Sequence, residues 1–223
     1  MSQAPSKHAR VADEPEPTWE IAQLFPAQGQ WSECDYLALN GNQLVELSNG
    51  KVEVLPMPTI MHQAISGYLY STLLAFVTAG DLGRVYFAPL RVRLWPGKFR
   101  EPDVVFMRTE RCERMGPRFW EGPDLVVEVV SEGEEDRRRD LDTKREEYAR
   151  AGIPEYWIVD PLKERITVLR LARKRYVVHG EFGKGTTATS HLLAGFAVDV
   201  KLALSGKVPP GPAKGPRKPK RRA

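Results

Sequence analysis

The sequence predicts an α/β protein in which a mixed β-sheet core is flanked by helices and preceded by an N-terminal β-hairpin. Short apolar runs rich in β-branched residues, at 104–107 and 125–130, indicate buried strands. Two long segments, 59–78 and 136–151, carry apolar residues at intervals of three and four, as amphipathic helices do. An Asn-Gly pair at 49–50 lies between two alternating segments and indicates a tight hairpin turn.

In chain order, the expected elements begin with the hairpin, whose strands would cover residues 43–47 and 51–55. Thr59 would cap the first long helix, because a side-chain oxygen at this position accepts a hydrogen bond from the first helical turn. Ile60 would start the buried stripe of that helix, and Gly80 would end the helix.

The remaining strands complete the predicted sheet. Residues 84–95 alternate between apolar and basic side chains, as one or two strands do. Residues 156–159 form another apolar run, and residues 166–171 and 176–178 are expected to form a hairpin. Strands and helices that alternate in this way favour an α/β sheet packed on helices.

The composition is that of a globular protein with one main domain. The 223 residues, 42% of them hydrophobic, are enough for a sizeable core. No apolar run approaches the length of a membrane span, so we expect no membrane partner. The first residues lack a basic and then apolar signal segment, and the two cysteines form no disulfide framework, so a cytoplasmic location is predicted.

The two ends of the chain differ from its centre. Residues 1–30 are rich in Pro and acids and are expected to be mostly disordered. Residues 206–223 contain seven Lys or Arg, no acid and many Pro and Gly, which predicts a disordered basic tail. Such a tail either binds DNA phosphates or keeps the chain soluble. Residues 31–205 form the predicted domain, and with 24 bases and 25 acids this domain is not basic overall.

Two carboxylates lie in or beside the predicted buried strands. Glu128 stands within an apolar run, where an ionised group is stable only if it is paired or bound to a cation. Asp103 precedes the other run directly. Because strand side chains alternate, Asp103 shares a face with Val105, and Glu128 shares a face with Val126 and Val130. If these strands are neighbours, the two carboxylates can converge.

Lys144 is the third candidate. It lies on the predicted helix 136–151, on the same stripe as Leu141, Tyr148 and Ala151. A lysine on the apolar face of a helix suggests an anionic partner.

These residues stand in a pattern that resembles the Uma2-like restriction endonuclease-like family (DUF820), within the PD-(D/E)XK nuclease superfamily. The resemblance covers roughly residues 35–180 and takes in residues 46–58 and His62. In the wider superfamily a lysine stands two residues after the Glu, where this chain has Val130, whereas the Uma2-like pattern takes its lysine from the next helix, as Lys144 does. The matching motifs are Pro102-Asp103-Val104, Pro123-Asp124-Leu125-Val126-Val127-Glu128-Val129-Val130-Ser131, Lys144, Tyr148, Gly152 and Pro154-Glu155-Tyr156-Trp157-Ile158-Val159-Asp160-Pro161.

The resemblance implies a restriction endonuclease-like fold and a metal-dependent nuclease acting on DNA. Asp103 and Glu128 would bind Mg²⁺, or Mn²⁺, with the Val129 carbonyl as a third ligand. Lys144 would activate the attacking water or offset charge on the phosphate. Glu46, which matches an acid of the family, would hold a second metal ion or a water.

Each residue also has a structural interpretation. Asp103 and Glu128 could form an ion pair with Lys144, Glu46 could face solvent, and His62 could cap or pack the helix on which it stands. At the level of function, the alternatives are a catalytically inactive nucleic-acid-binding module and a small-molecule phosphodiesterase. A homodimer is expected by analogy, because two cuts in a duplex need two sites.

Overall fold

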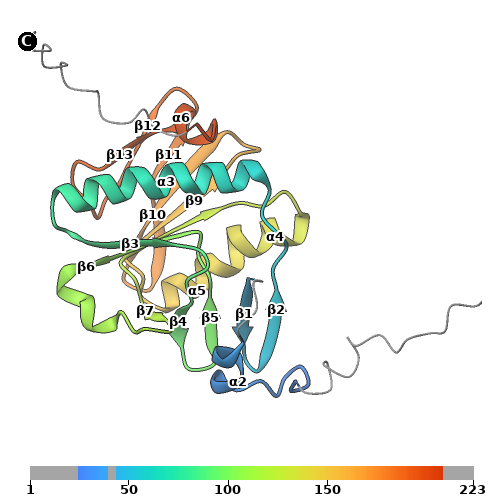
Figure 1. Cartoon of the computed structure of the whole chain (residues 1–223). Helices are drawn as coiled ribbons and strands as arrows, with labels where there is room; N and C mark the ends of the chain where they lie inside the picture. The colour runs from blue at the N-terminus through green and yellow to red at the C-terminus, as the bar shows by residue number, and fades with distance from the viewer. Residues whose placement is uncertain (1–24, 40–43, 208–223) are drawn as a thin grey trace, which may run out of the picture.

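The main feature of the fold is a six-stranded mixed sheet (Figure 1). This computed structural model describes residues 25–39 and 44–207. The strand order is β11-β10-β9-β8-β6-β3, and of its pairs only β8 and β9 run parallel. The strands are β3 (Gly83–Phe87), β6 (Val104–Arg108), β8 (Leu125–Val129), β9 (Glu155–Asp160), β10 (Arg165–Ala172) and β11 (Arg175–Gly183).

Helices cover both faces of this sheet. Helix α3 (Ile60–Ala79) packs on one face, in a core that includes Phe106 and Trp157. On the other face lies a helical segment made of α4 (Glu134–Arg138), a π-helical turn (Arg139–Thr143) and α5 (Lys144–Arg150). The sheet therefore separates two cores, and alternate residues of β6 and β8 belong to different ones.

A smaller five-stranded sheet lies beside α5 (Figure 1). Its order is β2-β1-β5-β4-β7. Helix α2 (Glu33–Ala38) adds Tyr36 to a third small core, which contains Trp31, Leu47 and Phe99. The strands are β1 (Val45–Ser48), β2 (Lys51–Val54), β4 (Val92–Trp95), β5 (Lys98–Arg100) and β7 (Trp120–Glu121).

Shorter elements complete the chain. A 3₁₀ helix (Thr109–Arg114) connects β6 to β7. Strands β12 (Thr187–Thr189) and β13 (Ala197–Asp199) form a two-stranded sheet, and α6 (Val200–Leu204) packs against the core under α3.

The predicted α/β class and its N-terminal hairpin are confirmed. Asn49 and Gly50 take positive φ angles of 50° and 75° in a two-residue turn between β1 and β2. Thr59 caps α3, since its hydroxyl accepts a hydrogen bond from the N–H of His62 at 3.1 Å. The expectation that Ile60 is buried is wrong, because it is 91% exposed at the start of α3, and the buried stripe begins at Ile65.

Residues 84–95 do form two strands, but these strands enter different sheets. Strand β3 is the edge of the main sheet, while β4 lies inside the smaller one. Alternation alone predicts strands without saying which sheet receives them, so the sequence indicated one sheet where residues 84–95 contribute to two.

Predictions about residues 1–24, 40–43 and 208–223, including most of the N-terminal segment and of the basic tail, lie outside the described residues. Gln28 is described, and its side-chain amide bonds to the N–H and the carbonyl of Val52 in the hairpin. In the described part of the chain, no helix is long and apolar enough to cross a membrane.

Candidate active site

Asp103 and Glu128 lie opposite each other at one end of the β6–β8 strand pair. The strands run antiparallel with Val104 facing Val127, so the next facing pair is Asp103 and Glu128. The Asp103 carboxylate also accepts a hydrogen bond from the N–H of Val129 at 2.7 Å. The structure thus brings together the two carboxylates that strand alternation placed on one face.

Glu128 is buried, and both of its oxygens are engaged. Its Oε2 accepts a hydrogen bond from Lys144 Nζ at 2.8 Å, and its Oε1 accepts one from the Tyr148 hydroxyl at 2.5 Å. Burial raises the pKa of Glu128 to about 8, although the Lys144 ammonium acts in the opposite direction. Asp103 and Asp140 raise this pKa further, because nearby negative charges disfavour the ionised carboxylate.

Lys144 is buried at the first position of α5, directly after the π-helical turn. Its Nζ lies 3.1 Å from Asp140 Oδ1 as well as 2.8 Å from Glu128 Oε2. Burial disfavours the charged ammonium, but the Glu128 and Asp140 carboxylates outweigh this effect and raise the pKa of Lys144. The helix therefore presents a positive charge to the strand ends, as the apolar stripe predicted.

His62 lies beside Asp103 and the Val129 carbonyl. Its Nε2 is 3.0 Å from the carbonyl oxygen and 3.3 Å from Asp103 Oδ2. Burial lowers the pKa of His62, because it disfavours the protonated ring. The hydrogen bond to Asp103 raises the pKa, and the net effect is a raised pKa for His62. The Val129 carbonyl oxygen and Asp103 Oδ2 are both predicted metal ligands. Both lie within 3.3 Å of His62 Nε2, so they face the same space.

This space is a pocket with a volume of about 250 Å³. Asp103, Glu128, Val129 and Lys144 all line it. Among the described residues of the lining, carboxylates outnumber permanent cations by six to two, because Lys144 and Arg139 are the only Lys or Arg there. The six acids are Glu101, Asp103, Glu128, Glu132, Asp136 and Asp140.

Glu46 is placed differently from the other predicted site residues. It is buried on β1 and is not part of the pocket lining. One oxygen pairs with the Arg100 guanidinium, and the other accepts a hydrogen bond from the Glu101 N–H at 3.2 Å. Both carboxylate oxygens of Glu46 are therefore engaged, one by Arg100 of β5 and the other by the N–H of Glu101.

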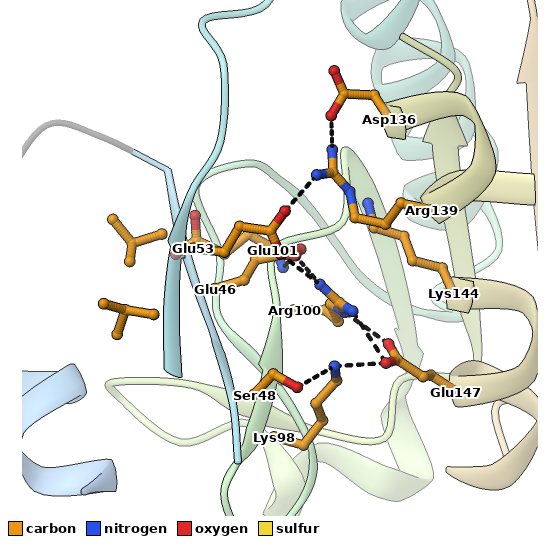
Figure 2. A network of polar contacts seen from close by, with 12 residues as sticks. Glu46, Ser48, Glu53, Lys98, Arg100, Glu101, Asp136, Arg139, Lys144 and Glu147 are labelled. Atoms are coloured by element: carbon orange, nitrogen blue, oxygen red, sulfur yellow. Dashed lines mark hydrogen bonds and ion pairs between the residues drawn. The ribbon is translucent and has the colours of Figure 1, made fainter. Parts of the chain in front are cut away.

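Glu46 belongs to a network of ion pairs that connects the small sheet to the helical segment (Figure 2). Arg100 donates to both oxygens of Glu147 on α5, at 2.7 and 3.1 Å. Lys98 joins Glu147 at 2.6 Å and donates to Ser48 at 3.0 Å. Through these contacts the small sheet holds the helix that carries Lys144.

A second set of contacts holds the other end of the same segment (Figure 2). Arg139, in the π-helical turn, pairs with Glu53 of β2 at 2.8 Å and with Asp136 at 2.7 Å. Lys144 thus lies between two points at which β1, β2 and β5 contact the helical segment.

Comparisons with known proteins identify the family of the chain and a solved structure of similar fold. The sequence model of the Uma2 family, described as "Putative restriction endonuclease", matches residues 31–203. The chain belongs to the Uma2 family. A solved structure, a "putative nuclease belonging to DUF820" from Anabaena variabilis ATCC 29413, shares 18% identity with a TM-score of 0.64, covering 79% of this chain and 98% of that chain. No curated protein matches the chain. The Uma2 resemblance and the restriction endonuclease-like fold are therefore confirmed.

Within this Uma2 fold, the pocket also contains Glu101, which was not among the predicted site residues. Glu101 is buried, and burial raises its pKa to about 7 although Arg91 acts against this, with its Nε 3.7 Å from Oε1. Among the described residues its Oε2 has no hydrogen-bond partner. Glu101 stands two residues before Asp103, so strand alternation would place both on one face, and this was the available signal.

Asp140 is a second acid that the sequence reasoning missed. Asp140 stands four residues before Lys144 and so lies on the same helix face. This spacing could have identified Asp140 as a partner of Lys144. His62 was considered mainly as a capping or packing residue. Its contact with Asp103 depends on how α3 crosses the main sheet, and no local pattern contains that information.

Proposed function

We propose that this Uma2 protein is a metal-dependent endonuclease that hydrolyses phosphodiester bonds in DNA. Asp103 and Glu128 would bind Mg²⁺, or Mn²⁺, together with the Val129 carbonyl. The supporting observation is that these oxygens and Lys144 line one pocket at the end of the β6–β8 strand pair. The same proposal includes a homodimer, DNA contacts of the basic tail and a cytoplasmic location.

The donor set fits a hard divalent cation. In the part of the chain that the structure describes, no three His, Cys, Asp or Glu side chains are grouped so that they could hold a metal ion. Coordination would therefore rest on two carboxylates, one backbone carbonyl and water. Mg²⁺ accepts such a site, because it prefers oxygen ligands and keeps several waters. The excess of carboxylates in the pocket also favours a cation.

The residues of the pocket have separate roles in the proposed hydrolysis. A bound divalent cation would supply Lewis-acid polarisation of the phosphate and a lower pKa for a coordinated water. Asp103 is held in place by the Val129 N–H and by His62. Lys144 Nζ would orient the attacking water or offset negative charge on the phosphate oxygens. Tyr148 fixes the Glu128 carboxylate from the other side.

A cleavage assay with the full chain tests this function. Single-stranded and duplex DNA should be cut with Mg²⁺ or Mn²⁺ and not with a chelator, and Asp103→Asn should abolish the cutting. DNA binding without cleavage under every metal would support the inactive binding module instead. Cleavage of a chromogenic phosphodiester, but of no DNA, would support the small-molecule phosphodiesterase.

A further inference from the structure

Apolar side chains, several of them exposed, form part of the pocket lining. Three of them are strongly exposed, with exposed fractions of 80% for Met57, 50% for Met61 and 60% for Leu162. Exposed apolar groups gathered at a cavity mark a binding surface more often than single scattered ones do. We call the following set of lining residues the apolar rim: Leu55, Pro56, Met57, Met61, Pro161 and Leu162.

Two separate segments build the apolar rim. The connection from β2 to α3 and the first turn of α3 provide one side, and the turn between β9 and β10 provides the other. The proline rings restrict the backbone of both segments, since each ring fixes a φ angle. The backbone of the apolar rim is therefore restricted, and its exposed side chains lie nearer to solvent than the buried carboxylates Glu128 and Asp140.

The positive charges of the pocket are already paired. Arg139 contacts Glu53 and Asp136, and Lys144 contacts Glu128 and Asp140. Duplex DNA is held mainly through Lys and Arg contacts to its phosphates. A duplex lying across the pocket would meet apolar side chains where it needs cations.

The size of the pocket gives the same indication. A volume of about 250 Å³ is too small to admit a duplex. In a duplex, moreover, the base faces are stacked inside and cannot reach the rim. An unpaired nucleotide has a phosphate, which a metal ion held by the pocket carboxylates would bind. It also has a free base face, which the apolar rim would contact. Enzymes that do chemistry on a base use single strands or nucleotides removed from the stack, and a base seated in this pocket would have to be unpaired for the same reason.

We propose that the apolar rim seats an unpaired base beside the scissile phosphate, so that the preferred substrate is single-stranded DNA. This assignment rests on the proposed nuclease function, because the carboxylates would repel a phosphate unless they hold the divalent cation of that proposal. A nucleotide matches both parts of the pocket, whereas an apolar protein surface would match the rim alone.

The test compares two variants that each replace exposed apolar side chains. The double variant Met57→Ser/Met61→Ser changes the rim. The control Ile60→Ser changes a side chain that is 91% exposed beside Met61 but is not part of the lining. Single-turnover cleavage of one labelled strand, alone and annealed to its complement, is measured with Mg²⁺ and with Mn²⁺. Fluorescence anisotropy with Ca²⁺ measures the affinity for the single strand.

We expect wild type to cut the single strand at least about tenfold faster than the duplex. The double variant should bind the single strand about tenfold more weakly, the scale expected when apolar contacts of one methionine size are lost. The control should stay within about twofold of wild type, as for a surface substitution outside the site.

The outcomes separate this proposal from the nuclease function. Equal or faster cutting of the duplex, or unchanged strand affinity in the double variant, overturns the rim assignment while the nuclease function stands. If no DNA is cut but strand affinity still falls in the double variant, the nuclease function fails and the assignment beside a scissile phosphate fails with it, which leaves the rim as a strand-binding surface only. If light scattering shows that the double variant loses a dimer while strand binding is unchanged, the rim is an interface between copies and the proposal is overturned.

Discussion

At the residue scale, the contact between Glu128 and Lys144 can be structural or catalytic. A buried ion pair is weak evidence for stability, since apolar side chains of similar size often stabilise as well. Here one lysine, Lys144, contacts two carboxylates, those of Glu128 and Asp140. A third carboxylate, that of Asp103, lies close by and accepts a hydrogen bond from the Val129 N–H. An arrangement chosen for stability alone would not gather this excess of negative charge.

Replacing Lys144 tests its role in the reaction. Lys144→Ala should keep metal affinity and lose on the order of a hundredfold in single-turnover rate, the usual effect of removing one positioned acid–base or charge-stabilising group. Adding Val130→Lys should restore part of the rate, because residue 130 lies on the same strand face as Glu128. Packing limits the rescue, since Val130 is buried.

Cleavage by wild type and both variants is compared at one metal concentration, with circular dichroism as the control for folding. If Lys144→Ala cuts as fast as wild type, Lys144 only pairs with the carboxylates and the proposed mechanism is wrong.

Part of the site could be predicted from local patterns. Asp103 and Glu128 follow from strand alternation, and Lys144 follows from helical spacing, because both periods are fixed by backbone geometry. The contact of His62 depends on the crossing of α3 over the sheet. The burial of Glu101 depends on its contacts with Glu46 of β1 and with Arg91, which lie elsewhere in the chain. Neither arrangement leaves a periodic signal in the sequence.

At the element scale, the small sheet and the helical segment are held together by buried charges. The Arg100 guanidinium is buried between Glu46 and Glu147 (Figure 2). In the sequence, Lys98-Phe99-Arg100 alternates like a strand with one solvent-exposed face, so the burial of its charges could not be predicted. The helix that carries Lys144 therefore depends on contacts invisible in its own sequence.

Removal of Arg100 should destabilise the fold strongly. Arg100→Met leaves the buried Glu46 carboxylate without its ion-pair partner and leaves Glu147 with Lys98 alone, which costs about 3–5 kcal/mol in the free energy of unfolding. Arg93 is a matched control on the neighbouring strand, because it pairs with Glu33 and Glu121 but is 26% exposed. Arg93→Met should cost no more than about 1 kcal/mol. Urea unfolding measures both, and equal losses would contradict a special role for the buried network.

Glu46 provides a related prediction. Because its oxygens are engaged with Arg100 and the Glu101 N–H, Glu46→Gln should lower the free energy of unfolding while metal affinity stays close to that of wild type. Calorimetric titration of the variant with Mn²⁺ makes the comparison. A clear loss of affinity in folded protein would instead assign Glu46 to metal or water binding.

The elements that the sequence did not predict are short. Strands β5 and β7 have three and two residues, and α6 has five, so in none of them does the alternation or the helical spacing repeat often enough to be recognised. Long elements such as α3 and β10 were predicted because their patterns repeat. Pairing between strands distant in the chain is set by packing, which explains why the second sheet was not predicted.

At the scale of the whole molecule, charge is distributed unevenly between the predicted domain and its C-terminal end. Residues 206–223 hold seven Lys or Arg, while residues 31–205 are close to neutral. Each phosphate contact made by a cation releases counterions, so the salt dependence of binding counts these contacts. The tail is therefore expected to supply much of the salt-dependent affinity for DNA.

Deleting residues 209–223 tests this expectation. The slope of log affinity against log salt should become shallower, while the truncated chain still cuts DNA that is present in excess. Anisotropy titrations at several salt concentrations measure the slope for both chains. Identical slopes would mean that the tail makes no phosphate contacts.

The central claim is that the pocket binds a divalent metal through Asp103 and Glu128, and calorimetric titration with Mg²⁺ and Mn²⁺ tests it most directly. The variants are Asp103→Asn and Glu128→Gln, with Glu121→Gln as a control that removes an exposed acid outside the pocket. Loss of even a partner behind a metal ligand commonly costs about 10–100-fold in affinity. We therefore expect each site variant to bind at least about tenfold more weakly than wild type and the control to bind normally. Unchanged affinity in both folded site variants would contradict the metal site and the mechanism built on it.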